Sequence, residues 1–431
     1  MEVTRVGQSD SLNMQGTLSD ARHASDTAGL FRLPVYISAA VFLLFFWAFE
    51  ALAQPQVDSV RLGVHPDKTR FVLEISEEPP YRVFTLPDPY RVVIDLPQVD
   101  WRVSEEAVRA QSAGNVDALR FGLFSQGTSR VVLDATAPVA VKSVFIIPPR
   151  DGQSYRLVVD LEEIPRATFM ERESRRAVLS DKPMPEPERR DVQPAPSGDR
   201  RPTVVVDPGH GGVDPGAIGV SGTYEKDLVL DYSLALRDML KETGRYRVVM
   251  TRDDDVFLRL RDRVAVAEEA GGDLFVSLHA NTHSSSQIRG ASVFTLSETA
   301  SDSEAAALAA KENRADIIAG VNLGGQTDAV SSILIDLMQR DTMNASKHFA
   351  NTLVTKLDGQ EVTLLNNTHR FAGFAVLKSP SVPSILFEIG YMTNAQEEQR
   401  LKTPAHRERV NRAMVRAIDG FFEWQEARDA Q

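Results

Sequence analysis

The chain has 431 residues, and 48 lysines and arginines against 60 aspartates and glutamates give it a formal net charge of −12. This acidic balance argues against nucleic acid as the partner of the whole chain. Cysteine is absent, which excludes cysteine-based zinc sites, disulfide scaffolds and thiol nucleophiles. A transition-metal site would therefore have to use histidine and carboxylate, and the length predicts two folded domains.

The first predicted element is an N-terminal signal segment, residues 1–53. Its apolar core, residues 35–49, has the length of a signal-peptide h-region and is short for a membrane span. The sequence ALA at 51–53 then offers a cleavage signal. We expect cleavage and export to the periplasm, with an uncleaved membrane anchor as the alternative. The unusual upstream arm leaves open whether Met1 or Met14 is the start.

Residues 55–165 form short alternating segments separated by proline and glycine, which is the pattern of an all-β sandwich. An Arg-x-x-x-Asp/Glu pattern begins at Arg70, Arg91, Arg130 and Arg156. The first and third copies are 60 residues apart and the second and fourth 65, which indicates a duplicated unit. We expect these charges to be solvated at the strand ends. Since no histidine or carboxylate cluster suggests chemistry, we expect a binding or docking module.

The second half of the chain predicts a linker and an α/β domain. Residues 166–201 are rich in Glu, Arg, Pro and Ser and predict a disordered linker. In residues 202–425 strands alternate with helices, which implies a mostly parallel sheet with helices on both faces. The polar interval at about 297–344 does not fit this scheme. It begins with a capping pattern at 301–304 and an alanine-rich helix, so we expect an inserted helical segment that acts as a lid.

Three candidate metal ligands lie at the ends of predicted elements. The stretch VVVDPGHGG places His210 after a buried strand that a Pro-Gly turn ends. Glu225 begins a helical pattern 15 residues later, and His279 ends a second buried run, LFVSLHAN. We expect all three at the carboxyl edge of one sheet, where open α/β sheets bind ligands. Taken singly, each histidine also fits a structural role.

Two imidazoles and one carboxylate with an open position form a standard zinc site of hydrolases. Such a site also needs a proton carrier, and Glu388 in SILFEIGY is the candidate. It follows an apolar strand, so partial burial should raise its pKa toward the working range. Asn281 either orients water or substrate or simply packs.

The motifs resemble those of a known family. Residues 203–425 resemble the catalytic domain of zinc-dependent N-acetylmuramoyl-L-alanine amidases of the type that separates daughter cells. The resemblance rests on segments spread in order over the domain: VVVDPGHGGVDPGA, the glutamate of YEKD, TRDDDVFLRLRDR, SLHAN, GASVF and FEIGYMTN. Residues 57–164 resemble the AMIN-type sandwich that targets periplasmic members to the envelope.

The resemblance assigns roles to the candidate residues. It implies that His210, Glu225 and His279 bind Zn²⁺ and that Glu388 is the catalytic acid/base. The reaction implied is hydrolysis of the amide between N-acetylmuramic acid and L-alanine of the peptidoglycan stem peptide. A zinc peptidase that cuts another amide bond of the cell wall is the alternative, and a non-catalytic envelope-binding protein is a third reading that the intact residue set disfavours.

The resemblance also gives the insertion a function. In cell-division members an extra helix blocks the zinc with a glutamate until an activator, often one with a LytM-like domain, displaces it. We expect Glu312 to be that residue here, with Glu304 as the second choice, and a solvated helix as the alternative. The apolar run at 330–338 would be the activator's docking helix or simply a packed helix.

Overall fold

The computed structural model describes residues 54–150, 152–174, 179–180, 198–321 and 334–430. The predicted signal segment, and residues 330–333 of the predicted docking helix, lie outside this part of the chain. In the described ranges no helix combines the length and apolar character needed to cross a membrane.

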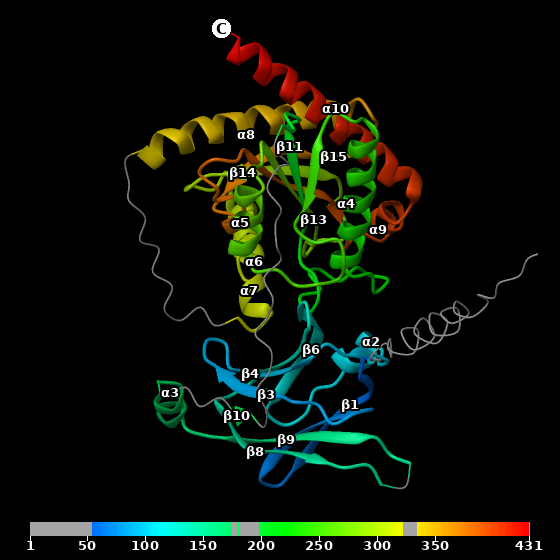
Figure 1. Ribbon diagram of the computed structural model, residues 1–431, viewed down its shortest axis with the longest axis vertical. Helices are drawn as coiled ribbons and strands as arrows, with labels where there is room; N and C mark the ends of the chain where they lie inside the picture. The colour runs from blue at the N-terminus through cyan, green and yellow to red at the C-terminus, as the bar shows by residue number, and fades with distance from the viewer. Residues whose placement is uncertain (1–53, 151, 175–178, 181–197, 322–333, 431) are drawn as a thin grey trace, which may run out of the picture. The chain divides into compact units, whose positions relative to one another are not determined.

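The N-terminal domain consists of two five-stranded sheets (Figure 1). Alternate strand residues such as Phe71, Leu73, Ile94 and Val131 are buried in one core between them. The first sheet has the order β5 (Asp100–Trp101), β1 (Gln56–His65), β2 (Lys68–Ile75), β9 (Tyr155–Glu163) and β8 (Val139–Ile147). The second has the order β10 (Leu179–Ser180), β3 (Arg82–Leu86), β4 (Arg91–Pro97), β7 (Thr128–Ala135) and β6 (Val116–Ser125), and α2 (Glu105–Arg109) precedes β6. The predicted all-β sandwich is confirmed.

We expected the charges of the Arg-x-x-x-Asp/Glu repeats to be solvated, but four of the eight are buried: Arg91, Asp95, Arg130 and Asp160. Arg130 on β7 lies opposite Asp95 on β4, with 2.6 Å between Nε and Oδ1, and both side chains are almost fully buried. Arg70 on β2 faces Asp160 on β9 at the same Nε–Oδ1 distance. Because the repeats run antiparallel, the arginine of one strand meets the acid of the next. Charge-assisted hydrogen bonds then offset the cost of burial.

The segment predicted as a disordered linker begins with ordered structure. Helix α3 (Arg166–Ser174) buries Phe169, whose ring packs edge-on against Tyr90 with 5.1 Å between the centroids. Strand β10 extends the second sheet by pairing with β3. One well-placed aromatic residue therefore anchors a segment whose composition is otherwise that of a linker.

The C-terminal domain is built on a six-stranded sheet. Its spatial order is β12 (Arg247–Met250), β11 (Thr203–Pro208), β13 (Leu274–Asn281), β16 (Ser384–Tyr391), β14 (Ala291–Leu296) and β15 (Leu364–Ala372). Neighbouring strands are parallel except where β14 meets β16. The predicted mostly parallel sheet is confirmed, and its parallel strands end at one common edge.

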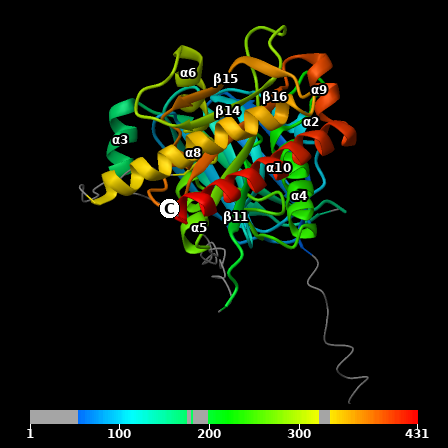
Figure 2. The same ribbon diagram turned by 90° about the horizontal axis from the view of Figure 1, so that it is seen from above.

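Helices cover both faces of this sheet. Alternate residues of β11 point to opposite faces: Val204 and Val206 pack with one group of helices and Val205 with the other. The first group comprises α4 (Glu225–Glu242), α8 (Leu334–Asp358) and α10 (Pro404–Asp429), of which α8 and α10 lie side by side (Figure 2). The second comprises α5 (Leu260–Glu269), α6 (Ser303–Glu312) and η1 (Ala375–Leu377).

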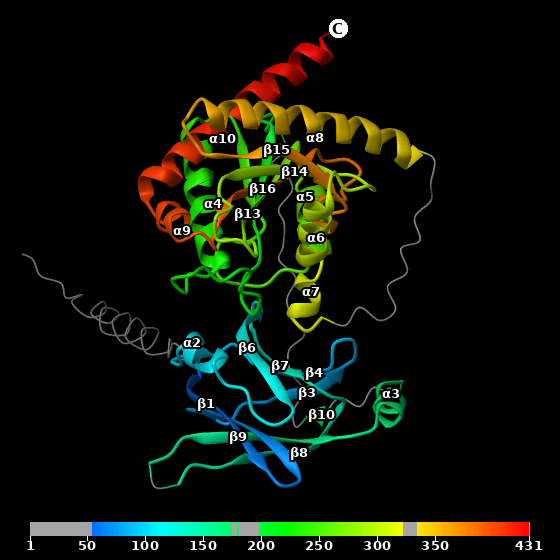
Figure 3. The same ribbon diagram turned by 180° about the vertical axis from the view of Figure 1, so that it is seen from behind.

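The predicted insertion contains α6, then α7 (Ala315–Ile318), which follows it on the same side of the domain (Figure 3), and the start of α8. Helix α8 continues without a break past residue 344, the expected end of the insertion, and buries Phe349 in the core. The short helix α9 (Ala395–Leu401) follows β16.

Candidate metal centre and active site

The turn that carries His210 has no room for a side chain at the residue before it. His210 itself has a φ of 58°, in the left-handed region that non-glycine residues rarely adopt. A Cβ on the preceding Gly209 would lie 2.4 Å from the His279 ring. Only glycine therefore lets the two histidines approach each other, and their ring centroids are 4.8 Å apart.

Two buried arginines hold the backbone of this turn. Arg263 donates to the Asp207 carboxylate at 2.7 Å and to the His210 carbonyl at 2.6 Å. Arg252 donates to the Pro208 carbonyl at 3.0 Å. Burial would raise the pKa of Asp207, but Arg263 and two hydroxyl donors lower it. The strained turn is thus tied to a buried ion pair. Arg252 lies in the segment TRDDDVFLRLRDR that carries the family resemblance, but the sequence assigned it no role.

Glu225 is fixed by backbone amides at the first position of α4. Its Oε2 accepts from the amide of Ala217 at 2.7 Å, and its Oε1 accepts from that of Ala280 at 2.9 Å. The carboxylate also lies at the positive end of the helix dipole. Because backbone amides hold both carboxylate oxygens, Oε1 has one fixed orientation toward the two histidines.

The structure brings His210, Glu225 and His279 together. Glu225 Oε1 lies 3.0 Å from His210 Nε2 and 3.1 Å from His279 Nδ1. Glu312 joins them from the last turn of α6, with its Oε2 3.3 Å from each of the same two nitrogens. Glu304, the second choice for this position, instead lies near the start of α6, away from the histidines.

This donor set fits a divalent metal. The ligand atoms of His210, His279 and Glu312 all lie within 4.8 Å of one another. His210 Nδ1 lies 2.9 Å from the Asp214 carboxylate, an arrangement that holds the proton on Nδ1 and leaves Nε2 free to coordinate. Nε2 is buried and has no hydrogen-bond partner among the described residues. Asp214 was not predicted, although it lies four residues after His210.

The charges of the cluster favour a cation. Burial alone would lower the pKa of His210, but the carboxylates of Glu225, Asp214 and Glu312 raise it well above its ordinary value. Burial would raise the pKa of Glu312, but Lys311 and the two histidines lower it to about 2. The same negative field that holds a proton on the imidazole also attracts a metal ion in its place.

Glu388 is a buried acid without a partner. On β16 it lies opposite His279 in the register with β13. It is fully buried, and neither carboxylate oxygen has a hydrogen-bond partner in the described part of the chain. Burial, and then the neighbouring charges of Glu225 and Glu312, raise its pKa well above the ordinary value. Such a carboxyl group is suited to accept and return protons.

The hydrogen bonds of Asn281, which follows His279 by two residues, are made to nearby backbone amides. Its Oδ1 accepts from the amide of Thr282 at 2.7 Å, and its carbonyl accepts from that of Met392 at 2.8 Å. These bonds order the chain after β13. A role of Asn281 in orienting water or substrate stays a prediction.

Comparison with known sequences agrees with this geometry. Residues 204–420 match the N-acetylmuramoyl-L-alanine amidase family, and residues 59–161 match the AMIN domain. The N-acetylmuramoyl-L-alanine amidase AmiC of Escherichia coli O6:H1 is 35% identical over 397 residues, which cover 89% of this chain and 94% of that protein. The chain belongs to the N-acetylmuramoyl-L-alanine amidase family.

Other amidases are similar over different lengths. AmiC of Neisseria meningitidis is 32% identical over 85% of this chain and 90% of its own length. AmiA of Escherichia coli K12 is 40% identical over 53% of this chain and 78% of its own length. Amidases of this family are generally metal-dependent, and the buried group of His210, His279 and Glu312 could bind a metal.

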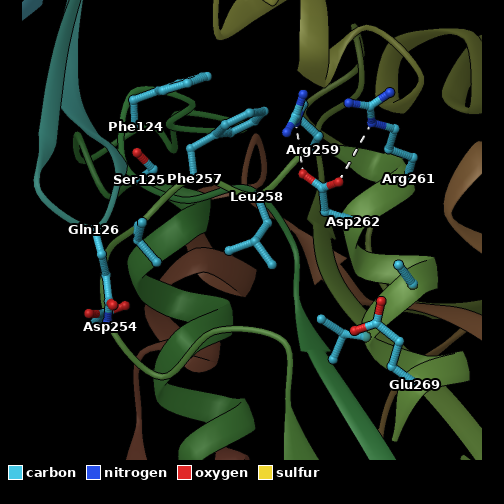
Figure 4. A pocket seen from close by; sticks show the side chains of 13 residues that line it. Phe124, Ser125, Gln126, Asp254, Phe257, Leu258, Arg259, Arg261, Asp262 and Glu269 are labelled. Carbon is cyan, nitrogen blue, oxygen red and sulfur yellow. Dashed lines mark hydrogen bonds and ion pairs between the residues drawn. The ribbon is translucent and has the colours of Figure 1, made fainter. Parts of the chain in front are cut away.

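The candidate metal centre is almost filled by side chains. The cavity bounded by His210, His279 and Glu312 measures only about 10 Å³. A larger cavity of about 440 Å³ is lined by other residues, among them Phe124 and Phe257 (Figure 4). Its lining includes none of the metal-centre side chains.

Three charged groups of the larger cavity pair with one another. Arg259 and Arg261 both point at Asp262, with Nε–O distances of 2.8 Å and 3.6 Å (Figure 4). Asp262, the partner of Arg259, is partly exposed. Arg263 does have a buried partner, Asp207.

Proposed function

We propose that this protein is a zinc-dependent amidase of the periplasm. It hydrolyses the amide between N-acetylmuramic acid and L-alanine in peptidoglycan during cell-wall remodelling and daughter-cell separation. One observation carries this proposal: two imidazole nitrogens and a Glu225 oxygen converge next to Glu388, a buried and unpartnered acid. The names of the amidase relatives and the AMIN match support the substrate and the compartment.

The residues divide the chemistry between them. His210, Glu225 and His279 would hold the metal, which when bound supplies Lewis-acid activation of water and of the scissile carbonyl. Glu388, with its raised pKa, accepts the proton of the attacking water and returns it to the leaving amide nitrogen. Asp214 fixes the tautomer of His210.

The resting protein is autoinhibited in this proposal. Glu312 fills the position that water and substrate need, since its Oε2 lies equally close to both histidine nitrogens. Lys311 lies 3.1 Å from its other oxygen and strengthens the anionic form. With a cavity of about 10 Å³, no substrate carbonyl can enter until α6 moves away. An activator protein, for which the family resemblance suggests a LytM-like domain, would displace the helix.

Digestion of purified peptidoglycan sacculi by the zinc-loaded full chain with Glu312→Ala, which lacks the blocking carboxylate, tests the reaction. Mass spectrometry should find free stem peptides that begin with L-alanine. Shortened peptides still attached to muramic acid would support the zinc peptidase instead, and peptidoglycan left intact by every variant would contradict both.

Glu312→Ala should raise the basal rate of peptide release by about tenfold or more, because an inhibitory contact of only ~1.4 kcal/mol corresponds to a factor of ten. The matched control is Glu298→Ala, which removes an exposed glutamate before α6 and should change nothing. A Glu312→Ala protein that folds normally and has an unchanged or abolished rate would contradict autoinhibition.

A further inference from the structure

Arg370 on β15 is a buried cation held by the inserted helix. Its side chain is 7% exposed. Its Nε donates to Asp302 Oδ2 at 2.9 Å, its Nη2 donates to the other Asp302 oxygen, and Nη2 also donates to Glu304 Oε2 at 3.0 Å. Within the described residues these bonds all end on the first turn of α6, where Asp302 is also the N-cap. The cation belongs to the sheet, whereas both anions belong to the insertion.

Arg370 lies on the catalytic face of the sheet. Phe294 on β14 is opposite Leu386 of β16 on one side and opposite Arg370 on the other. Leu386 and Glu388 are two residues apart on one strand and so share a face. Two strand spacings of about 4.8 Å then separate Arg370 from the strand of Glu388, about 10 Å across the sheet.

A histidine near the active site reaches the same glutamate. His283 Nε2 lies 3.6 Å from Glu304 Oε1, and the His283 ring packs edge-on against Tyr391, with 6.3 Å between centroids. Glu304 is 58% exposed, whereas the side chains of His283 and Arg370 are 27% and 7% exposed. Arg370 and His283 are thus two basic groups that face one carboxylate, that of Glu304.

Departure of α6 would leave these two basic groups without their anion. A guanidinium that α6 no longer covers has its hydrogen-bond donors free, and it can form charge-assisted hydrogen bonds with another carboxylate. In an uncut muropeptide the sugars are neutral and the lactyl carboxyl is part of the scissile amide. The carboxylates of the substrate therefore all lie on the stem peptide, beyond the bond that is cut.

The distance between Glu304 and Glu312 on α6 indicates which residue of the stem peptide carries that carboxylate. Glu304 and Glu312 are eight residues apart on α6, which corresponds to about 12 Å along the axis at 1.5 Å per residue. An extended peptide spans at most about 3.5 Å per residue, and a side-chain-linked residue somewhat more. A carboxylate on the second or third residue of the stem thus reaches Arg370 when the scissile amide is at the metal centre.

We propose that Arg370, with His283 beside it, binds a carboxylate of the stem peptide and makes the enzyme selective for stems that carry a free carboxylate at the second or third residue. This inference rests on the proposed amidase function. In the resting state the first turn of α6 occupies the peptide subsite while Glu312 occupies the metal centre. The insertion therefore covers two parts of one substrate path.

The test compares muropeptides that differ in one carboxylate. The substrates are synthetic N-acetylmuramyl tripeptides with free carboxylates, with the carboxylate of the second residue amidated, or with that of the third amidated. The reference protein is the zinc-loaded full chain with Asp302→Asn, Glu304→Gln and Glu312→Ala, in which no acid of α6 competes. It should prefer the free form over one of the two amidated forms by about tenfold or more, since hydrogen bonds to charged groups are strong.

Adding Arg370→Gln should raise KM for the free form about tenfold and abolish that preference, while cleavage of the discriminated amide form stays within about twofold. Arg370→Lys should restore part of the preference. Arg412→Gln, which removes an exposed arginine on α10, is the matched control and should leave the preference intact. Thermal melting and zinc content verify that each variant is folded.

The outcomes separate the two proposals. Equal cleavage of all three substrates by the reference protein, or an equal loss on all three after Arg370→Gln, would overturn the binding of a stem carboxylate and leave the amidase function intact. If the reference protein releases no peptide from any substrate, the amidase function itself fails, and the carboxylate binding with it.

Discussion

The sandwich and the candidate metal centre treat buried charge in opposite ways. In the sandwich, Arg130 and Asp95 face each other across neighbouring strands and satisfy one another. In the amidase sheet, Glu388 and the Nε2 of His210 are equally buried, but the described residues give them no hydrogen-bond partner. Removing one partner of such a pair is destabilising, because the other charge is then left buried and unpaired. Unsatisfied groups gathered at one sheet edge are instead arranged for a ligand and a substrate, and this contrast can be tested residue by residue.

Glu388→Gln should have the largest effect on activity. Without its proton carrier, the enzyme should lose about 10²- to 10⁴-fold in rate, the usual contribution of general acid–base catalysis. Stability should not fall, because the lost oxygen had no partner. Peptide release in the Glu312→Ala background measures the rate, and thermal melting measures stability. A variant that keeps more than about a tenth of the rate would contradict the assignment.

Asp214→Asn should act through the metal. Because Asp214 fixes His210, its loss should weaken zinc binding by about 10- to 100-fold, as expected for a residue that supports a ligand. Competition with a chromophoric chelator measures the affinity. Asp231→Asn, which changes an exposed aspartate on α4, serves as the control. Equal affinities in the two variants would show that Asp214 does not support the metal centre.

Asp160→Asn in the sandwich should alter stability and leave catalysis unchanged. Arg70 and Lys68 donate to this buried carboxylate, so its loss should lower the free energy of unfolding by about 2 kcal/mol. The exposed pair of Asp67 and Lys142 gives the control, Asp67→Asn, which should cost much less because solvent screens the pair. Denaturant unfolding compares the stabilities of the two variants. A loss of turnover per folded molecule in Asp160→Asn would contradict a purely structural role of this residue.

Protonation of Asp160 should also make the stability of the wild-type protein depend on pH. The hydrogen bond from Arg70 lowers the pKa of Asp160 below its ordinary value. The stabilising contribution is therefore complete above about pH 4 to 5, near and above the unfolded pKa of about 3.9, and is lost as the pH falls further. In Asp160→Asn this part of the acid dependence should disappear.

Local patterns were enough to predict the fold class and to place four candidate residues. His210 and His279 end apolar strands and Glu225 begins a helix, and parallel strands bring such ends to one edge. Glu388 follows from the same reasoning. Such positions depend on strand and helix signals that a short window of sequence contains.

Other features depend on which elements become neighbours. The burial of the sandwich repeats follows from the pairing of β4 with β7 and of β2 with β9, which no single strand reveals. The order of α3 depends on where Phe169 meets Tyr90. The placement of Glu312 rather than Glu304 at the histidines follows from how Leu308 packs α6 on the sheet.

Gly209 has a consequence for the evolution of the enzyme. A single methyl group at this position would lie 2.4 Å from the His279 ring and push it away from the metal centre. Glycine is the one amino acid without a Cβ, so every missense mutation at this position meets the same obstacle. We expect natural variants of this enzyme that still cut the cell wall to have explored other positions around the site and to have kept glycine at this one.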